Sequence, residues 1–317
     1  VIDLGPGAGK QGGNIVFEGD LSALKQSQTL TGRYFSSRAE INKKPRCAKG
    51  YISVRNATLH NLHNLSVDVP LSVMVAVTGV AGSGKSSFVM GALAPQCPEA
   101  IVIDQKPIHT SIRSHIASWC GAFDTIRSLF AEKNHVSASW FSANAKGACP
   151  ECNGRGVIQT DLAFMDTVTL PCEACQGQRY NPQALKYRYQ GKSIAEVLSL
   201  SINDAGEFFL NEPQLRPIFR SLVEVGLGYL RLGESLNHLS GGECQRLKLA
   251  SQLNHDSDMY IFDEPTTGLH PSDVASLLKL FNRLVARGNT VIIIEHNMEL
   301  IAQADWIIDI GPDRKSV

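Results

Sequence analysis

Residues 79–86 read GVAGSGKS, and they match the phosphate-loop pattern G-x-x-x-x-G-K-[ST] at every fixed position. The stretch follows the apolar run 73–78 and precedes a segment that is expected to form a helix. A loop between a buried strand and a helix binds phosphate, because its backbone N–H groups and the helix N-terminus point at the same oxygens. This stretch therefore predicts a nucleotide-binding α/β fold.

Further motifs follow downstream and narrow the class of nucleotide-binding protein. Residues 239–242 read LSGG and open an expected helix over 243–254, and the apolar strand 259–263 leads into Asp-Glu. His296 follows another apolar strand. A phosphate loop, an LSGG turn and a strand ending in Asp-Glu, in that order, are typical of ABC-type ATPases. Such ATPases build each nucleotide site from two half-sites, so this chain is expected to carry halves.

The chemistry assigns a task to each residue type. Lys85 can reach the β- and γ-phosphates, and the Ser86 hydroxyl can ligate Mg²⁺. Asp263 would hold the same ion through water, and Glu264 would polarise the attacking water. The residues expected to bind ATP and Mg²⁺ are Gly79, Gly82, Gly84, Lys85, Ser86, Ser87, Asp263, Ser240, Gly241 and Gly242.

Two more residues complete the expected catalytic set with Glu264. His296 would contact the γ-phosphate and report its loss, and Gln105, after the strand 100–104, would sense Mg²⁺ and the attacking water. The N–H groups that open the helix at Ser240 form a second anion site. One nucleotide needs a single phosphate loop, so this second site is expected to face a nucleotide held by a partner module.

Composition excludes several classes of protein. The chain has 317 residues, a formal net charge of zero and 43% hydrophobic residues, which is typical of a globular protein with an ample core. No apolar run approaches the roughly 20 residues of a membrane helix, so no membrane partner is expected. A zero net charge means that any nucleic-acid binding must use a local basic patch. The chain begins at Val1 rather than Met, so we expect a fragment.

Four of the eight cysteines form a regular quartet. CPECNG at 149–154 and CEACQG at 172–177 share the form C-x-x-C-x-G. Four thiolates suit a closed tetrahedral Zn²⁺ site, whose ligands would be Cys149, Cys152, Cys172 and Cys175. Residues 157–170 would form a hairpin standing on it. Disulfides or an iron–sulfur cluster are the alternatives, but phosphate-loop chemistry points to the cytoplasm, where thiols stay reduced.

The order of motifs predicts how the chain is divided. Residues 1–7 resemble residues 307–313, so residues 1–40 are expected to be the tail of a preceding ABC module. Residues 41–108 and 236–317 would form one ATPase core, with a mostly parallel sheet and an antiparallel β subdomain. Residues 109–235 would form a helical insertion with the zinc module at 145–182.

The surroundings of the quartet are basic and contain aromatic residues. Two interpretations stay open: a solvated face with buried aromatic side chains, or a nucleic-acid surface on which exposed rings stack on bases. The basic residues are Lys106, Arg113, Lys146, Arg155 and Arg179, and the aromatic residues are Trp119, Trp140, Phe141, Tyr180 and Tyr187.

Nearly the whole chain resembles the C-terminal half of the UvrA family, which belongs to the bacterial nucleotide-excision-repair excinuclease. The resemblance rests on TGVAGSGKSS, IDQKPI, CPECNGRG, PCEACQGQRYN, LSGGECQRLKLA, DEPTTGLH and EHNMELIAQADWIIDIGP. It implies two tandem ABC modules per chain, a dimer, ATP-modulated binding of damaged DNA, loading of UvrB, and a zinc module implicated in damage recognition. By matched position, the nucleotide and zinc residues named above take those roles.

Departures from the family pattern favour a UvrA-like paralogue over the principal repair protein. Eighteen residues separate Ser86 from Gln105, fewer than is usual, and SHIASWCG lacks a proline that the family has there. Some paralogues are linked to resistance against DNA-intercalating compounds. A soluble ABC ATPase with a protein-interaction role, or a transporter ATPase, is the alternative. Transporters have a shorter interval between Lys85 and Ser240 and lack a four-cysteine module.

Overall fold

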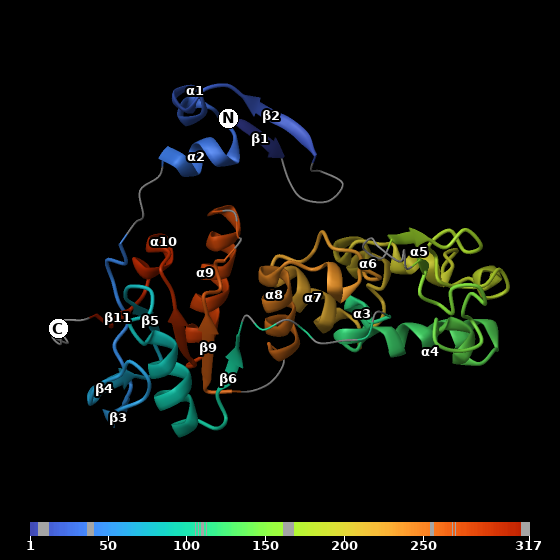
Figure 1. The fold of residues 1–317 in the computed structure, drawn as a ribbon. Coiled ribbons are helices and arrows are strands. Elements are labelled where there is room, and N and C mark those ends of the chain that lie inside the picture. The colour runs from blue at the N-terminus through green and yellow to red at the C-terminus, as the bar shows by residue number, and fades with distance from the viewer. Residues whose placement is uncertain are drawn as a thin grey trace. The chain divides into compact units, whose positions relative to one another are not determined.

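The computed structural model describes residues 1–5, 13–36, 41–104, 106, 108, 111, 113–160, 168–253, 257–267, 269 and 271–311. The chain divides into two compact units. The first comprises Val1–Pro107, Glu224–Gly226 and Ser240–Val317, and the second comprises Ile108–Val223 and Leu227–Leu239. Figure 1 draws both units and labels many of their helices and strands.

The first unit contains a five-stranded parallel sheet (Figure 1). In spatial order its strands are β11 (Trp306–Asp309), β5 (Met74–Thr78), β10 (Thr290–Ile294), β9 (Met259–Asp263) and β6 (Ile101–Ile103). Val75, Ile261 and Ile292 are fully buried in it. Continuous apolar runs rich in β-branched residues are typical of parallel strands covered on both faces. The sequence pattern therefore predicted β5, β6, β9 and β10, whereas β11 was not predicted.

Two antiparallel pairs accompany the parallel sheet. The first is β1 (Ile2–Gly5) with β2 (Asn14–Glu18), and the second is β3 (Tyr51–Ala57) with β4 (Leu65–Pro70). The second pair has an irregular register between Val54 and Ala57. Its buried residues Val54 and Val69 belong to the same apolar core as the strand β5. The predicted fold class, a mostly parallel sheet with an antiparallel β component, is confirmed.

The helices of the first unit include one with a clear amphipathic pattern, α9 (Pro271–Ala286). They are α1 (Leu21–Gln26), α2 (Leu30–Ser36), η2 (Ser87–Leu93), η3 (Ala94–Gln96), α8 (Gly241–Gln252), α9 (Pro271–Ala286) and α10 (Met298–Ile301). In α9 the buried residues Val274, Leu277, Phe281 and Leu284 recur at helical spacing.

The segment after the phosphate loop departs from an ordinary α-helix. It is a π-helix in η2, where the N–H of Ala94 donates to the carbonyl of Val89, and it closes with the 3₁₀ turn η3. Phe88 and Leu93 of η2 are fully buried against the sheet core. The sequence pattern predicted a helix here but did not predict its π-helical type, which is rare.

The second unit is mainly helical and contains one β-hairpin. Its elements are α3 (Ile116–Trp119), α4 (Ala122–Asn134), η4 (Ala138–Phe141), β7 (Val157–Thr160), β8 (Val168–Pro171), η5 (Ala184–Lys186), α5 (Ile194–Leu198), α6 (Ile202–Phe208), α7 (Arg216–Glu224) and η6 (Leu236–His238). β7 and β8 pair in antiparallel fashion, as the expected hairpin requires. Among the described residues, no helix of either unit has both the length and the apolar character needed to cross a membrane.

Candidate functional site: a nucleotide half-site and a four-cysteine cluster

The polar residues of the nucleotide motifs gather at one edge of the parallel sheet. The phosphate loop follows β5, Asp104 follows β6, Glu264 follows β9 and His296 follows β10. Parallel strands all end at the same edge, and ligands of open α/β sheets bind there. The sheet therefore brings together segments that lie up to about 220 residues apart in the sequence.

The phosphate loop adopts a conformation that depends on its glycines. Gly79, Gly82 and Gly84 have φ values of 140°, 79° and 101°, a region that residues with a Cβ rarely adopt. A Cβ on Gly79 would also lie 2.1 Å from the carbonyl oxygen of Ile310. A larger residue at that position would push the loop away from the end of the sheet.

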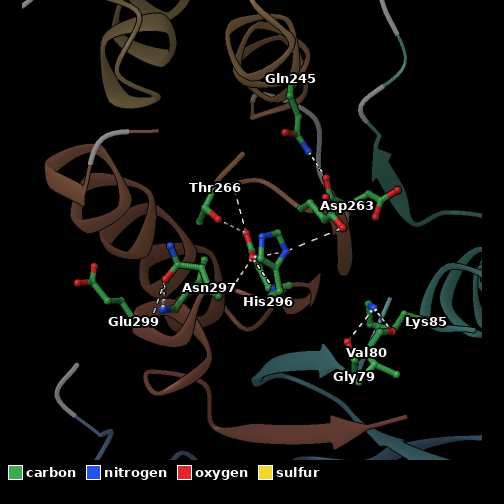
Figure 2. Close-up of polar contacts among 12 residues, drawn as sticks. Gly79, Val80, Lys85, Gln245, Asp263, Thr266, His296, Asn297 and Glu299 are labelled. Carbon is green, nitrogen blue, oxygen red and sulfur yellow. Dashed lines mark hydrogen bonds and ion pairs between the residues drawn. The ribbon is translucent and has the colours of Figure 1, made fainter. Parts of the chain in front are cut away.

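Lys85 holds the loop in this curled form. Its Nζ donates to the carbonyl oxygens of Gly79 at 2.9 Å and Val80 at 3.0 Å, as Figure 2 shows. Asn61, on the turn between β3 and β4, braces the same loop, since its Nδ2 donates to the carbonyl oxygen of Gly82 at 2.8 Å. The ammonium group thus already lies at the loop into which phosphates would bind.

Asp263 lies among like charges. Burial raises the pKa of its half-buried carboxyl group, the nearby carboxylates of Glu264 and Asp104 raise it further, and the Lys85 ammonium lowers it. Carboxylates that raise one another's pKa favour a cation between them, because its charge offsets their repulsion. The donor set therefore fits Mg²⁺, which binds through carboxylate and hydroxyl oxygens and water.

Glu264 has an unusual backbone conformation. Its φ is +46°, in the left-handed region, and its N–H donates to the carbonyl oxygen of Ile294 at 2.9 Å. Non-glycine residues in this region are uncommon and cluster at active sites. His296 lies beside it, with 4.0 Å between His296 Nδ1 and Glu264 Oε1. The structure thus brings the predicted base and the predicted phosphate sensor together.

The LSGG turn begins α8 two residues earlier than the sequence pattern suggested. Ser240 is the N-cap: its Oγ accepts from the N–H of Glu243 at 3.3 Å, and its own N–H donates to Glu243 Oε2 at 2.7 Å. This capping box places Gly241 and Gly242 inside the first turn rather than before it. A Cβ on Gly242 would lie 2.8 Å from the carbonyl oxygen of Thr267.

The same helix contacts the ends of two neighbouring strands. Gln245 Nε2 donates to the carbonyl oxygen of Asp263 at 2.7 Å (Figure 2) and of Ile103 at 3.4 Å. Lys248 Nζ donates to Asp104 Oδ1 at 2.6 Å and to the carbonyl oxygen of Lys106 at 2.7 Å. Although burial raises the pKa of Asp104, the Lys248 hydrogen bond and charge leave it below its ordinary value. Gln105, the third predicted catalytic residue, lies outside the described residues.

The four predicted zinc ligands form one buried cluster in the second unit. The Sγ atoms of Cys149, Cys152, Cys172 and Cys175 all lie within 4.8 Å of one another, and the cysteines are not disulfide-bonded. The Sγ atoms of Cys149 and Cys172 are 4.0 Å apart, and those of Cys152 and Cys175 are 3.7 Å apart. A tetrahedral site with Zn–S bonds of about 2.3 Å would place its sulfurs about 3.8 Å apart. The cluster therefore fits a closed Zn²⁺ site.

The backbone holds the two cysteine turns together. The N–H of Cys149 donates to the carbonyl oxygen of Arg179, and the N–H of Cys172 donates to that of Gly156. Gly154 and Gly177, the glycines of the two C-x-x-C-x-G motifs, have φ values of 73° and 78°, a region that residues with a Cβ rarely adopt. The hairpin β7–β8 lies between the two cysteine turns in the sequence.

The predicted basic residues are largely accessible. Lys106, Lys146 and Arg155 are exposed, whereas Arg113 and Arg179 are half-buried. The aromatic residues are mostly not accessible: Phe141 and Tyr180 are buried, and the Tyr180 hydroxyl donates to the carbonyl oxygen of Phe141. Trp119, with 39% of its surface exposed, is the most accessible of the five.

Sequence reasoning missed several residues that shape the nucleotide site. Asn61, Gln245, Lys248 and the buried Glu295 were not predicted. Glu295 and Gln245 could have been noticed in the sequence. Each is a polar residue at a position where the apolar pattern around it predicts a buried side chain, and a buried polar group needs hydrogen-bond partners. Asn61 had none, since its role depends on where the turn after β3 packs.

Comparisons with known proteins agree with this geometry. A family model described as ABC transporter matches residues 62–267. The chain is 43% identical to the UvrABC system protein A of Staphylococcus aureus strain COL and 40% identical to that of Helicobacter pylori strain J99. Each alignment covers 99% of this chain and 37% of the relative, so the chain spans little more than a third of their length.

One solved structure is similar over nearly the whole fold. The crystal structure of UvrA2 from Deinococcus radiodurans matches with a TM-score of 0.89 and 41% sequence identity. The match covers 97% of this chain and 41% of that one. It therefore includes both the parallel sheet and the helical segment with the four cysteines.

Proposed function

The chain belongs to the UvrA-type ABC ATPases, and we propose that it is one ATP-hydrolysing module of a protein that recognises damaged or drug-modified DNA. The observation that carries the proposal is the cluster of Lys85, Asp263, Glu264 and His296 at one edge of the sheet. An ammonium for phosphate, carboxylates for Mg²⁺ and water, and an imidazole for the γ-phosphate are the groups that phosphoryl transfer to water needs.

Within this module each residue has a defined part. The N–H groups between Gly79 and Ser87 would hold the phosphates together with Lys85, and Ser86 and Asp263 would hold Mg²⁺. Glu264 would accept the proton of the attacking water. The bound Mg²⁺ would neutralise charge on the phosphate oxygens. Gln105 retains its predicted role as a sensor of the ion and the water.

The helix α8 would serve a second nucleotide. Ser240, Gly241 and Gly242 lie at its N-terminus, where N–H groups and the helix dipole favour an anion. Since one phosphate loop accounts for one nucleotide, we propose that this end binds the γ-phosphate of ATP held by a second ABC module. A dimer or a tandem module would supply it, as the relatives' greater length allows.

Zinc and DNA are the remaining proposed ligands. The cysteine cluster would hold one structural Zn²⁺ with no open position for catalysis. Exposed Lys106, Lys146 and Arg155 would contact DNA phosphates, and the half-buried Arg113 and Arg179 would contribute as well. The relatives' name, UvrABC system protein A, supports UvrB as a further partner. The short interval from Ser86 to Gln105 supports a paralogue, acting in the cytoplasm where thiols stay reduced.

The test is nucleotide binding and turnover by three forms of the chain. Wild type should bind ATP in the presence of Mg²⁺, and Lys85→Ala should weaken binding by roughly ten-fold or more, because it removes a phosphate-contacting charge. Glu264→Gln should bind ATP like wild type and lose turnover by about 100-fold or more. Calorimetry and phosphate release measure the two effects. Wild-type protein that fails to bind ATP with Mg²⁺ would overturn the proposal.

A further inference from the structure

The carboxylate of Glu295 is buried next to the two segments that contain Glu264 and His296. Glu295 follows the last residue of β10, and its side chain is fully buried. Burying a charge costs free energy unless the charge is paired or fully hydrogen-bonded. In the described part of the chain no lysine or arginine lies within ion-pair distance of this carboxylate; the basic side chain that does is His296, with 3.8 Å between its Nδ1 and Glu295 Oε2. Hydrogen bonds therefore also have to compensate for the burial of the carboxylate.

Four donors satisfy the two oxygens of Glu295, two for each oxygen. Oε1 accepts from the N–H of Thr266 at 2.9 Å and from its hydroxyl at 2.5 Å. Oε2 accepts from the N–H groups of His296 at 2.8 Å and Asn297 at 2.9 Å. Figure 2 labels the three residues that donate these bonds, Thr266, His296 and Asn297.

The two oxygens therefore serve two different segments. One segment follows β9 and contains Glu264 two residues before Thr266, and the other follows β10 and begins with His296. The carboxylate is a rigid planar group, so it fixes the separation of the two segments. The ring of His296 lies next to both carboxylates: its Nδ1 is 4.0 Å from Glu264 Oε1 and 3.8 Å from Glu295 Oε2.

We propose that Glu295 is a positioning residue for ATP hydrolysis: it sets the distance between Glu264 and His296 by binding both of their segments through one carboxylate. The inference rests on the proposed ATPase function. Glu295 is fully buried and its carboxylate binds Thr266, His296 and Asn297, so it would act on the catalytic step through these neighbours. Displacements of about 1 Å at reacting groups reduce rates by up to about 100-fold.

The chemistry of the link explains why a carboxylate is required. Glutamine has the same shape but only one acceptor oxygen, so its NH₂ group would face two donors of one segment. Repulsion between donors would move that segment and leave the other in place. Nucleotide affinity depends mainly on the phosphate loop after β5, which Glu295 does not contact in the described residues.

The experiment compares Glu295→Gln with wild type and with Asp305→Asn. Asp305 is a matched control because its carboxylate is likewise buried, with 1% of the side chain exposed. It accepts hydrogen bonds from the N–H of Met74 and from the side chains of Arg46 and Asn42, at the opposite end of the strands β5 and β11. Glu295→Gln should lower kcat by about ten-fold or more with KM changed less than about two-fold. Asp305→Asn should lower the unfolding midpoint and leave kcat within about two-fold of wild type.

A double-mutant cycle separates positioning from a general loss of packing. If Glu295 acts through His296, then Glu295→Gln combined with His296→Ala should have the kcat of His296→Ala alone, within about two-fold. Independent, multiplicative losses would overturn the inference, as would wild-type kcat in Glu295→Gln. If Glu295→Gln does not fold, Thr266→Val is tested instead, because valine has the shape of threonine but lacks the hydroxyl that donates to Glu295 Oε1. This variant should lower kcat by about three-fold without changing KM. Wild-type kcat in Thr266→Val would also overturn the inference.

The outcome distinguishes this inference from the proposed function itself. A wild-type chain that does not turn over ATP removes the premise, and the Glu264→Gln comparison detects that case. A wild-type chain that turns over ATP while Glu295→Gln keeps full kcat leaves the ATPase intact and rejects the positioning role alone.

Discussion

At the scale of single residues, the backbone of the nucleotide site is strained at Glu264, the residue expected to act on the attacking water. Glu264 has a positive φ although it carries a full side chain, and it is held there by its N–H bond to the carbonyl of Ile294. The conformation turns the chain sharply at the end of β9, so that the Glu264 carboxylate lies near His296. Such strain persists only where surrounding contacts over-determine it.

His115 makes a residue-scale prediction about acid stability. Burial, together with the charge of Arg179, lowers the pKa of this histidine from 6.5 to about 4. Between pH 6.5 and about 4 the unfolded chain therefore binds a proton that the folded chain does not, and stability falls as the pH falls. From pH 6.5 to pH 5 the loss should be about 2 kcal/mol.

The variant His115→Asn provides the comparison. His115 is the N-cap of α3, where its Nδ1 accepts from the N–H of Ser118, and asparagine can accept the same bond. Urea unfolding followed by tryptophan fluorescence should show a smaller loss between pH 6.5 and pH 5 in the variant. Release of zinc by acid affects both proteins equally, so the difference reports His115. Identical pH dependence in both would contradict the prediction.

At the scale of elements, the hairpin β7–β8 and the two cysteine turns depend on the cysteine cluster more than on apolar side chains of their own. The hairpin β7–β8 joins its two cysteine turns, and the exposed Ile158 and Leu170 show that it buries little apolar surface of its own. Replacing Cys172 by alanine should release zinc and increase hydrogen exchange between residues 149 and 175. Binding energies of structural zinc sites, roughly 10–16 kcal/mol, are large enough for this region to depend on the metal.

A matched thiol serves as the control for this prediction. Cys120 lies in the same unit outside the cluster, and burial raises its pKa to about 11, so it is an unreactive thiol. Cys120→Ala should retain one zinc per chain in elemental analysis, whereas Cys172→Ala should lose it, and both should bind ATP like wild type. Zinc content that is unchanged in Cys172→Ala would show that the cluster does not hold the metal.

The elements also show what a sequence can and cannot predict here. The strands β5 and β9 were located within a residue, because short uninterrupted apolar runs rich in β-branched and aromatic residues are typical of buried strands. The start of α8 was wrong by two residues, because the capping box of Ser240 and Glu243 draws both glycines into the helix. Glu295 was missed because its partners lie on two segments that are close only after the sheet forms.

The same reasoning explains the outcome for the aromatic residues. Spacing and composition left stacking on DNA bases open for all five, but Phe141 and Tyr180 are buried and pack within the second unit. Only tertiary contacts distinguish a core ring from a surface ring when the local sequence is polar. Trp119 remains accessible for a role in recognition.

At the scale of the whole molecule, an ABC half-site makes turnover depend on a second module. Two chains arranged head to tail would place the phosphate loop of each against the LSGG turn of the other. Specific activity of this chain should therefore be low and should rise with protein concentration, because pairing follows mass action. A brisk rate that does not depend on concentration would contradict the half-site argument.

Complementation tests the same prediction more directly. Lys85→Ala disables the phosphate loop, and Ser240→Asp preserves the helix cap but places a carboxylate beside the γ-phosphate. Each variant alone should be nearly inactive. An equimolar mixture should recover about a quarter of wild-type activity, because half of the random pairs then contain one intact site of two. Mixtures with no more activity than the separate variants would exclude composite sites between these chains.

The proposed binding of DNA also belongs to the scale of the whole molecule. With a net charge of zero, attraction to DNA depends on the local set of Lys106, Arg113, Lys146, Arg155 and Arg179. Contacts with about three to five phosphates predict a slope of log affinity against log salt of about −3 to −5. The exposed pair Lys146 and Arg155 should account for about two of these contacts.

Replacing that pair by alanine should therefore reduce the slope by about 2 and weaken binding to intact and damaged duplexes alike, because phosphate contacts carry no sequence information. The control replaces the exposed Lys43 and Lys44, which changes the net charge equally and should leave the slope unchanged. Fluorescence titrations at several salt concentrations measure all three proteins. Equal slopes in the two double variants would mean that charge alone, and not a basic surface near the zinc cluster, governs binding. A preference for damaged duplex that survives the Lys146 and Arg155 replacements would show that recognition of the lesion uses groups other than these phosphate contacts.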